Sequence, residues 1–76
     1  MNNIMNRQKQ RYALVKWISG KHSGTTTHNV QVEWIKGFEE DDIDFVNSYV
    51  IEWRVPPKPA KGWHFYDGQI LEVSGE

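Results

Sequence analysis

Short apolar runs with a period of two, each ended by a cluster of Gly, Pro, Ser or Thr, restrict the fold more than any other feature of the sequence. In the run from Tyr49 to Val55, every second residue is Tyr, Ile, Trp or Val. This period is typical of a β-strand that buries one face. Pro56, Pro57 and Pro59 come next and prevent the continuation of a central strand. The pattern predicts an all-β fold.

Two earlier segments are also predicted to be strands. Tyr12 to Ile18, with the sequence YALVKWI, has strand composition with apolar residues on both faces. A loop rich in Gly, Ser and Thr follows it. Asn29 to Ile35 then alternates, which places Val30, Val32 and Trp34 on one side of a half-buried strand. Both segments are expected to turn apolar side chains toward one core.

The last apolar segment runs from Trp63 to Val73 and allows two structures. Asp67-Gly68 between apolar runs is a signal for a two-residue hairpin turn. The alternative is one long strand that bends at a bulge at Gly68. We favour the long strand, because the hairpin would have arms of only about four residues. In the long strand one face holds Trp63, Phe65, Leu71 and Val73, and the other holds His64, Tyr66 and Ile70.

The segment from Glu39 to Asp44 is acidic at five of its six positions and cannot form the core of a strand. It predicts a helical turn, capped by Asp41 or Asp42, with Ile43 and Val46 turned inward. A segment of this kind is usually a solvated loop. The alternative is that it attracts a basic peptide and orients it.

The length of 76 residues predicts one small domain. A chain of this size buries only about 60% of its unfolded surface, so the four Trp, three Tyr and three Phe are expected to supply much of the core. Most connections are too short for crossovers, which favours four to five antiparallel strands curled into a small barrel. We expect residues 1–10 to form a flexible arm and residues 11–76 the single barrel domain.

Charge, cysteine content and the length of the apolar runs narrow the function class. Nine Lys and Arg against ten Asp and Glu give a net charge of −1, which disfavours non-specific nucleic-acid binding as the main activity. The absence of Cys excludes disulfides, thiolate metal sites and cysteine nucleophiles. The apolar runs are too short for a membrane span, and the N-terminal residues lack the apolar region of a secretory signal. The sequence predicts a soluble intracellular domain, either a whole protein or a piece of a longer one.

The segment NSYVIEWRVPPKPAKGWHFYDGQILEV, residues 47–73, resembles the first hairpin of Tudor-type domains in the SH3-like barrel superfamily. The first strand of that hairpin corresponds to residues 49–53, and its second strand to Trp63, Tyr66, Gly68, Ile70 and Val73. The segments YALVKWI and HNVQVEWI look like later strands of such a barrel but precede the hairpin, which implies a rearranged strand order. The resemblance also implies a nuclear chromatin reader that holds methylated Lys or Arg of a short peptide in an aromatic cage.

The rings beside the proline-rich loop are the main candidates for such a cage. Trp63, Phe65 and Tyr66 lie at the start of a strand, where neighbouring residues face opposite ways, so rings on at least one side need a role other than packing. Rings attract a methylated ammonium through cation–π interaction and apolar contact. Tyr66 and Trp63 are the first candidates, while packing in the core is the alternative for each ring and the expectation for Trp17, Trp34 and Trp53. The predicted ligand-binding residues are Tyr49, Trp63, Phe65, Tyr66, Glu39, Glu40, Asp41 and Asp42. The predicted partner is a basic peptide such as a methylated histone-type tail.

Nucleic acid and a second copy of the chain are the alternative partners. Phosphates would bind five cations in two groups while exposed rings stack on bases: Arg7, Lys9 and Arg11 in the arm and at its end, and Lys58 and Lys61 beside Trp63. Such binding would be weak and sensitive to salt. Exposed aromatic strands could also form a dimer, so the expected state is a monomer or a dimer.

Catalysis and metal binding have little support in the sequence. His22 and His28 are six residues apart across a loop and His64 is remote, which matches no metal-site spacing. Ser23 carries neither an elbow motif nor an oxyanion signature. We expect a non-catalytic domain without a cofactor or a metal.

Overall fold

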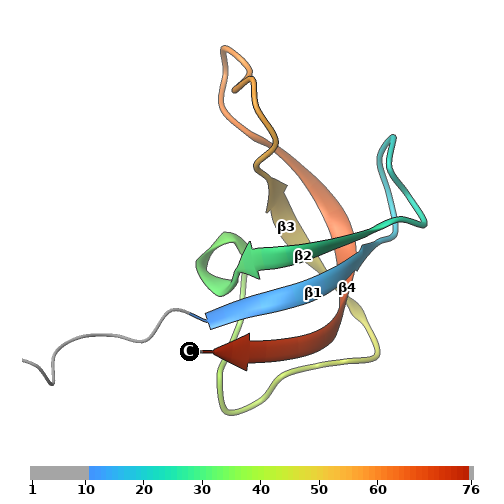
Figure 1. Ribbon diagram of the computed structural model, residues 1–76, viewed down its shortest axis with the longest axis vertical. Helices are drawn as coiled ribbons and strands as arrows, with labels where there is room; N and C mark the ends of the chain where they lie inside the picture. Colours follow the sequence, from blue (N-terminus) through green and yellow to red (C-terminus); the bar gives the residue numbers. More distant parts are fainter. Residues whose placement is uncertain (1–10, 76) are drawn as a thin grey trace, which may run out of the picture.

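The computed structural model describes residues 11–75, which form an antiparallel β-sheet (Figure 1). The predicted arm, residues 1–10, lies outside the described residues. The elements, in chain order, are β1 (Arg11–Trp17), β2 (Thr26–Gln31), the short 3-10 helix η2 (Val32–Trp34), β3 (Ser48–Trp53) and β4 (His64–Gly75). The prediction of an all-β fold is confirmed.

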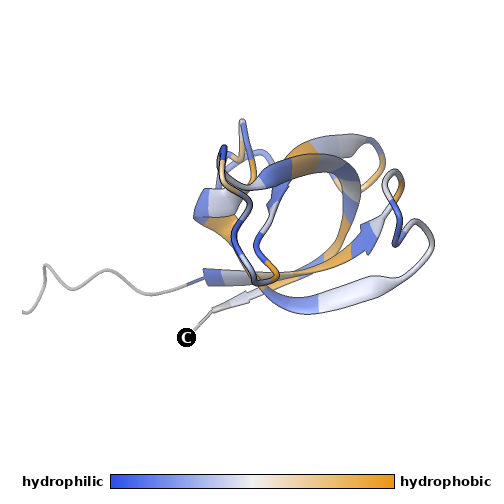
Figure 2. Ribbon diagram, turned by 90° about the horizontal axis from the view of Figure 1, so that it is seen from above, coloured by the Kyte–Doolittle hydropathy of each residue, from blue (hydrophilic) through white to orange (hydrophobic). Residues whose placement is uncertain are grey.

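The strands are ordered β2-β1-β4-β3, and every neighbouring pair is antiparallel. Figure 2 shows the sheet curving around a common axis. The edge strands β2 and β3 do not pair within residues 11–75, so the strand ladder does not close into a barrel. Ile35, which follows η2, forms an isolated bridge with Ile51 of β3, and the Lys36 backbone N–H donates to the Val50 carbonyl at 2.9 Å.

The core lies on the inner face of this curved sheet. Alternate residues of β1 supply three of its members, as the period of two requires. Trp17, predicted to be in the core, is 2% exposed, and its indole N–H donates to Thr27 Oγ1 at 2.8 Å. The buried hydrophobic residues are Ala13, Val15, Trp17, Val30, Ile35, Ile51 and Ile70.

β4 is a single long strand, as predicted, but its irregularity is not at Gly68. Gly68 pairs regularly with both β1 and β3, and a Cβ atom there would lie only 2.7 Å from Val15 Cγ1. The register shifts instead between Ile70 and Glu72, which leaves Leu71 as the extra residue. The predicted faces are therefore wrong for Val73, because the bulge turns it to the core side with Ile70.

Two predicted details of the middle of the chain are also wrong. The strand predicted from Asn29 to Ile35 ends at Gln31, and η2 then redirects the chain toward β3, so that Ile35 reaches Ile51. In the acidic segment the structure has turns and bends in place of a helical turn. Ile43 packs against the core as predicted, but Val46 is 80% exposed.

Asp44 organises the chain before β3 in place of the predicted helical cap. The backbone N–H groups of Asn47 and Val46, and the side-chain amide of Asn47, donate to its carboxylate. These hydrogen bonds lower the pKa of the Asp44 carboxyl below its ordinary value. The Asp44 backbone N–H donates in turn to the Tyr49 hydroxyl at 2.8 Å.

Candidate functional site

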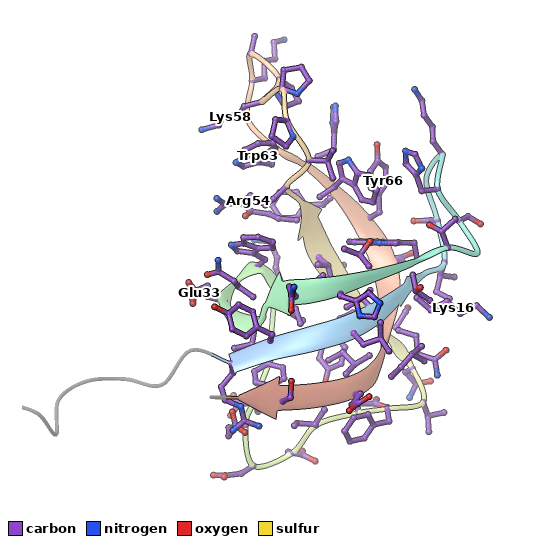
Figure 3. All side chains as sticks on the ribbon, viewed as in Figure 1. Lys16, Glu33, Arg54, Lys58, Trp63 and Tyr66 are labelled. Carbon is purple, nitrogen blue, oxygen red and sulfur yellow. The ribbon has the colours of Figure 1, made fainter. Side chains whose placement is uncertain are left out.

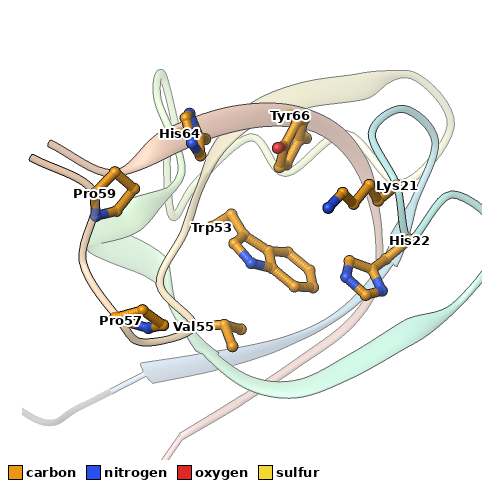
Figure 4. A pocket seen from close by; sticks show the side chains of 8 residues that line it. All are labelled: Lys21, His22, Trp53, Val55, Pro57, Pro59, His64 and Tyr66. Atoms are coloured by element: carbon orange, nitrogen blue, oxygen red, sulfur yellow. The ribbon is translucent and has the colours of Figure 1, made fainter. Parts of the chain in front are cut away.

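A pocket of about 300 Å³ opens at the end of the sheet where β3 ends and β4 begins (Figure 4). Two regions that are far apart in the sequence build it: the loop between β1 and β2, and the continuous segment that includes the end of β3, the proline-rich loop and the start of β4. The lining residues are Lys21, His22, Trp53, Val55, Pro57, Pro59, His64 and Tyr66. The wall consists mainly of aromatic rings and proline rings, and we call it the aromatic pocket.

Trp53 is the central ring of the aromatic pocket and also contacts the core. Its ring meets that of buried Trp17 edge to face, with centroids 5.0 Å apart. Tyr66 meets Trp53 in a second edge-to-face contact at 6.1 Å. Such contacts stabilise ring pairs beyond the area that they bury. Trp53 therefore packs against the core, as predicted, and also lines the pocket, which the sequence did not indicate.

His22 covers one face of Trp53. The two rings are nearly parallel, with an interplanar angle of 7° and centroids 4.6 Å apart. The loop that carries His22 is tied to β4, because the Ile18 N–H donates to the Asp67 carbonyl at 2.8 Å and the Asp67 N–H donates to Ser19 Oγ at 2.9 Å. These bonds fix the wall of the pocket that the loop forms.

Gly20 allows this loop to pack directly against Tyr66. Its φ of +92° is in the region that favours glycine, and a Cβ atom at this position would lie 2.7 Å from Tyr66 Cδ1. Any larger residue would push the loop away from the ring. The position of His22 therefore depends on Gly20.

The charge at the aromatic pocket is positive. Lys21 lies at its rim, and no acidic residue is among the described residues that line it. His64 completes the set of rings, 6.2 Å from Tyr66 and tilted by 39° to it. The pocket thus offers ring faces and apolar surface to a ligand, with one flexible ammonium group nearby.

The predicted cage residues are divided between different places. Tyr66 lines the aromatic pocket. Phe65 points to the outer face of the sheet and is 42% exposed, which contradicts the view that it packs in the core. Trp63 lies beside Arg54 and Lys58. Tyr49 packs against the core and anchors Asp44 through its hydroxyl.

The acidic residues Glu39, Glu40, Asp41 and Asp42 lie in the loop before β3, away from the aromatic pocket. Glu40 forms an ion pair with Arg11 at 2.8 Å. Arg11 is the register partner of Gly75, the last residue of β4. The pocket is at the opposite end of that strand, beside His64. The structure therefore does not bring the predicted acidic support to the rings.

The cations predicted for nucleic acid are also divided. Arg7 and Lys9 lie outside the described residues. Arg11 is paired with Glu40 at the acidic end of the sheet. Lys58 and Lys61 lie in the loop between β3 and β4, where the Lys58 ammonium is 5.9 Å from the ring centroid of Trp63. A single surface cannot use Arg11 together with these two lysines.

The sequence missed six members of the pocket besides Trp53: Lys21, His22, Val55, Pro57, Pro59 and His64. Only His64 has a signal in the strand register, since it pairs with Trp53 on the inner face. Within residues 11–75 no group of three His, Cys, Asp or Glu residues could hold a metal ion. No helix in the same range is long and apolar enough to cross a membrane.

The chain matches no protein-family model, and no curated protein or solved structure shows a significant match to it. The aromatic pocket is therefore interpreted from its own geometry and chemistry.

Proposed function

We propose that the chain is a non-catalytic binding module whose aromatic pocket takes the methylated ammonium group of a basic peptide. The observation that carries this proposal is the convergence of four rings around one pocket: His22 from the loop between β1 and β2, and Trp53, His64 and Tyr66 from β3 and β4. Ring faces attract such a cation through cation–π interaction. This arrangement differs from the cage predicted from the sequence in all members except Tyr66.

The absence of a carboxylate from the described lining favours a fully methylated ammonium over an unmodified one. An unmodified ammonium has three N–H donors, and each must be paired when the group is buried. Among the described lining residues there is no carboxylate to accept them. A trimethylated ammonium has no donors to satisfy and presents only charge and methyl groups, which suit rings.

The acidic loop has a lesser part in this proposal. Its carboxylates lie at the other end of the sheet, and at physiological ionic strength the Debye length is about 8 Å. Their attraction for a basic peptide is therefore screened at the pocket and acts mainly on the rate of encounter. A histone-type tail is a partner of this chemistry, and the proposal places the chain in the nucleus with it.

We also propose that the curved sheet is a rearranged SH3-like barrel of the Tudor type. The bridge between Ile35 and Ile51 and the hydrogen bond from Lys36 to Val50 support this, because they connect the chain after β2 to the free edge of β3. Slow amide exchange at Lys36, comparable with that of β1, is the expected NMR result. Rapid exchange there would show an open sheet.

The functional proposal is tested by NMR titration of the isotope-labelled chain with a basic peptide in unmodified and trimethylated forms. The trimethylated peptide should shift the Trp53 indole and the signals of His22, His64 and Tyr66. His28, exposed on β2, does not line the aromatic pocket, so His28→Ala is a control for His64→Ala. Equal binding of both peptides, or shifts outside the pocket, would contradict the proposal.

A further inference from the structure

We propose that the outer face of β3 and β4 binds single-stranded nucleic acid through cations that lie over aromatic rings. This face is separate from the aromatic pocket, because none of its residues lines that pocket. Trp34 is partly buried and also packs against the core. Glu52 and Phe65, which pair in register, mark its centre. The residues that form it are Lys36, Arg54, Lys58, Trp34, Trp63 and Phe65, and we call it the cation–ring face.

Arg54 is the best positioned cation on this face. The carbon at the centre of its guanidinium is 5.1 Å from the ring centroid of Trp34 and 5.5 Å from that of Trp63. Its Nε donates to Glu52 Oε1 at 2.7 Å in an ion pair, which offsets part of the charge of the guanidinium. This bond uses one of the five N–H donors of a guanidinium, so the donors on the Nη nitrogens are left for a ligand. A planar fork that is already oriented suits the oxygens of a phosphate.

Two lysines make contacts of the same kind on this face. The Lys58 ammonium lies 5.9 Å from the ring centroid of Trp63, and the Lys36 ammonium lies 4.8 Å from that of Phe65. Figure 3 shows Lys58, Trp63 and Arg54 on one side of the molecule. Cations that alternate with partly exposed rings are the combination that binds single strands, since phosphates pair with the cations and unpaired bases stack on rings. The bases of a duplex cannot stack in this way.

The distribution of charge supports an anionic ligand at this end. The net charge is only −1, but the acidic residues of the segment 39–44 gather at the other end of the sheet. Arg54, Lys58 and Lys61 lie in the loop between β3 and β4, and Lys21 lies in the neighbouring loop. These four cations outnumber the two carboxylates of Glu33 and Glu52, which lie on the side of Arg54. A polyanion is therefore attracted to one end of the molecule and repelled from the other, which fixes its orientation.

The test uses the full chain and a fluorescent oligothymidylate of about ten nucleotides. Three phosphate contacts predict that log K falls with log salt concentration with a slope of about −2. Arg54→Gln and Lys58→Gln should each reduce the size of this slope by about 0.7. Lys16→Gln should leave it unchanged, because Lys16 is exposed on the opposite side of the molecule in Figure 3. Phe65→Leu should weaken binding about tenfold through lost stacking.

The shifts in an NMR titration with the oligothymidylate keep this proposal distinct from that for the aromatic pocket. They should appear at the Arg54 Nε–H, the Trp63 indole and Phe65, and not at Trp53 or His64. No binding at low salt would overturn the proposal, as would tighter binding of a duplex of the same length. Binding of a phosphopeptide without binding of the oligothymidylate would also overturn it.

Discussion

The aromatic pocket and the cation–ring face lie on opposite sides of the same hairpin, and their rings have different neighbours. In the pocket, rings contact rings: Trp53 meets Trp17, His22 and Tyr66. On the outer face, rings contact cations, with Arg54 between two indoles. A ring without a neighbouring cation attracts a cationic ligand. A ring that already contacts a cation holds that cation in position for an anionic ligand. Under the two proposals, the same residue type would serve opposite ligands on the two faces.

The largest expected difference between the two faces is in how much their rings stabilise the fold. Comparing the variants Tyr66→Ala and Phe65→Ala measures this difference. Tyr66 packs against the core, Trp53 and Gly20, so its truncation should lower the free energy of unfolding by about 2–4 kcal/mol. Phe65 is exposed on the outer face, and its truncation should cost less than about 1 kcal/mol. Urea denaturation of both variants gives the two values. Equal losses would mean that the outer face is also part of the core.

A smaller effect is expected on the affinity of the aromatic pocket for its ligand, and its direction shows whether that ligand is a cation or an anion. Lys21→Ala removes the ammonium at the rim of the pocket, so the affinity for a trimethylated peptide should rise about two- to fivefold. Isothermal titration calorimetry checks this, with Lys16→Ala as the matched loss of an exposed lysine. If Lys21→Ala weakened binding instead, the ligand of the aromatic pocket would be anionic.

The smallest expected effect is a change with pH that is confined to the loop around Asp44. The pKa of the Asp44 carboxyl is lowered in the fold, chiefly by the N–H groups of Asn47 and Val46. The carboxylate therefore stabilises the loop at pH values above the ordinary pKa of an aspartate. That stabilisation is lost as the pH falls through the lowered pKa of the folded state. Amide shifts of Val46 and Asn47 followed during an acid titration should report the loss, and Asp44→Asn should abolish the titration. Simultaneous shifts at Trp53 or Arg54 would show that the three regions are coupled.

Local pattern predicted much of the fold, and it failed where a distant contact decides the backbone. β1 and the length of β4 follow from composition and period, since strands favour such residues wherever they pack. The end of β2 could not be predicted, because Val32 and Trp34 continue its period while the chain turns to bring Ile35 to Ile51. The bulge at Leu71 was missed for a similar reason: it reflects pairing with Leu14 and Val15 of β1, which are distant in the chain.

The candidate site was harder to predict than the strands. Tyr66 could be identified as a ring beside a proline-rich loop. His22 could not, because its contact joins a loop to Trp53 at the end of β3, 31 positions later in the chain. The pairing of Arg54 with Trp34 has the same origin. Ring and charge counts indicated that such contacts would exist, but not which residues make them.

The sequence by itself determined that this protein is built from β-strands and that rings and cations would lie near a proline-rich loop. These properties follow from residue type and from a period of two, which act over a few neighbouring positions. The expectation that rings supply much of the core was wrong, because Trp17 is the one ring in the buried core of the described residues and the other core members are aliphatic. Only the tertiary structure decided which rings face inward, where the charges separate, and which residues share a pocket. Those outcomes depend on strand register, and a shift of one residue exchanges the two faces of a strand.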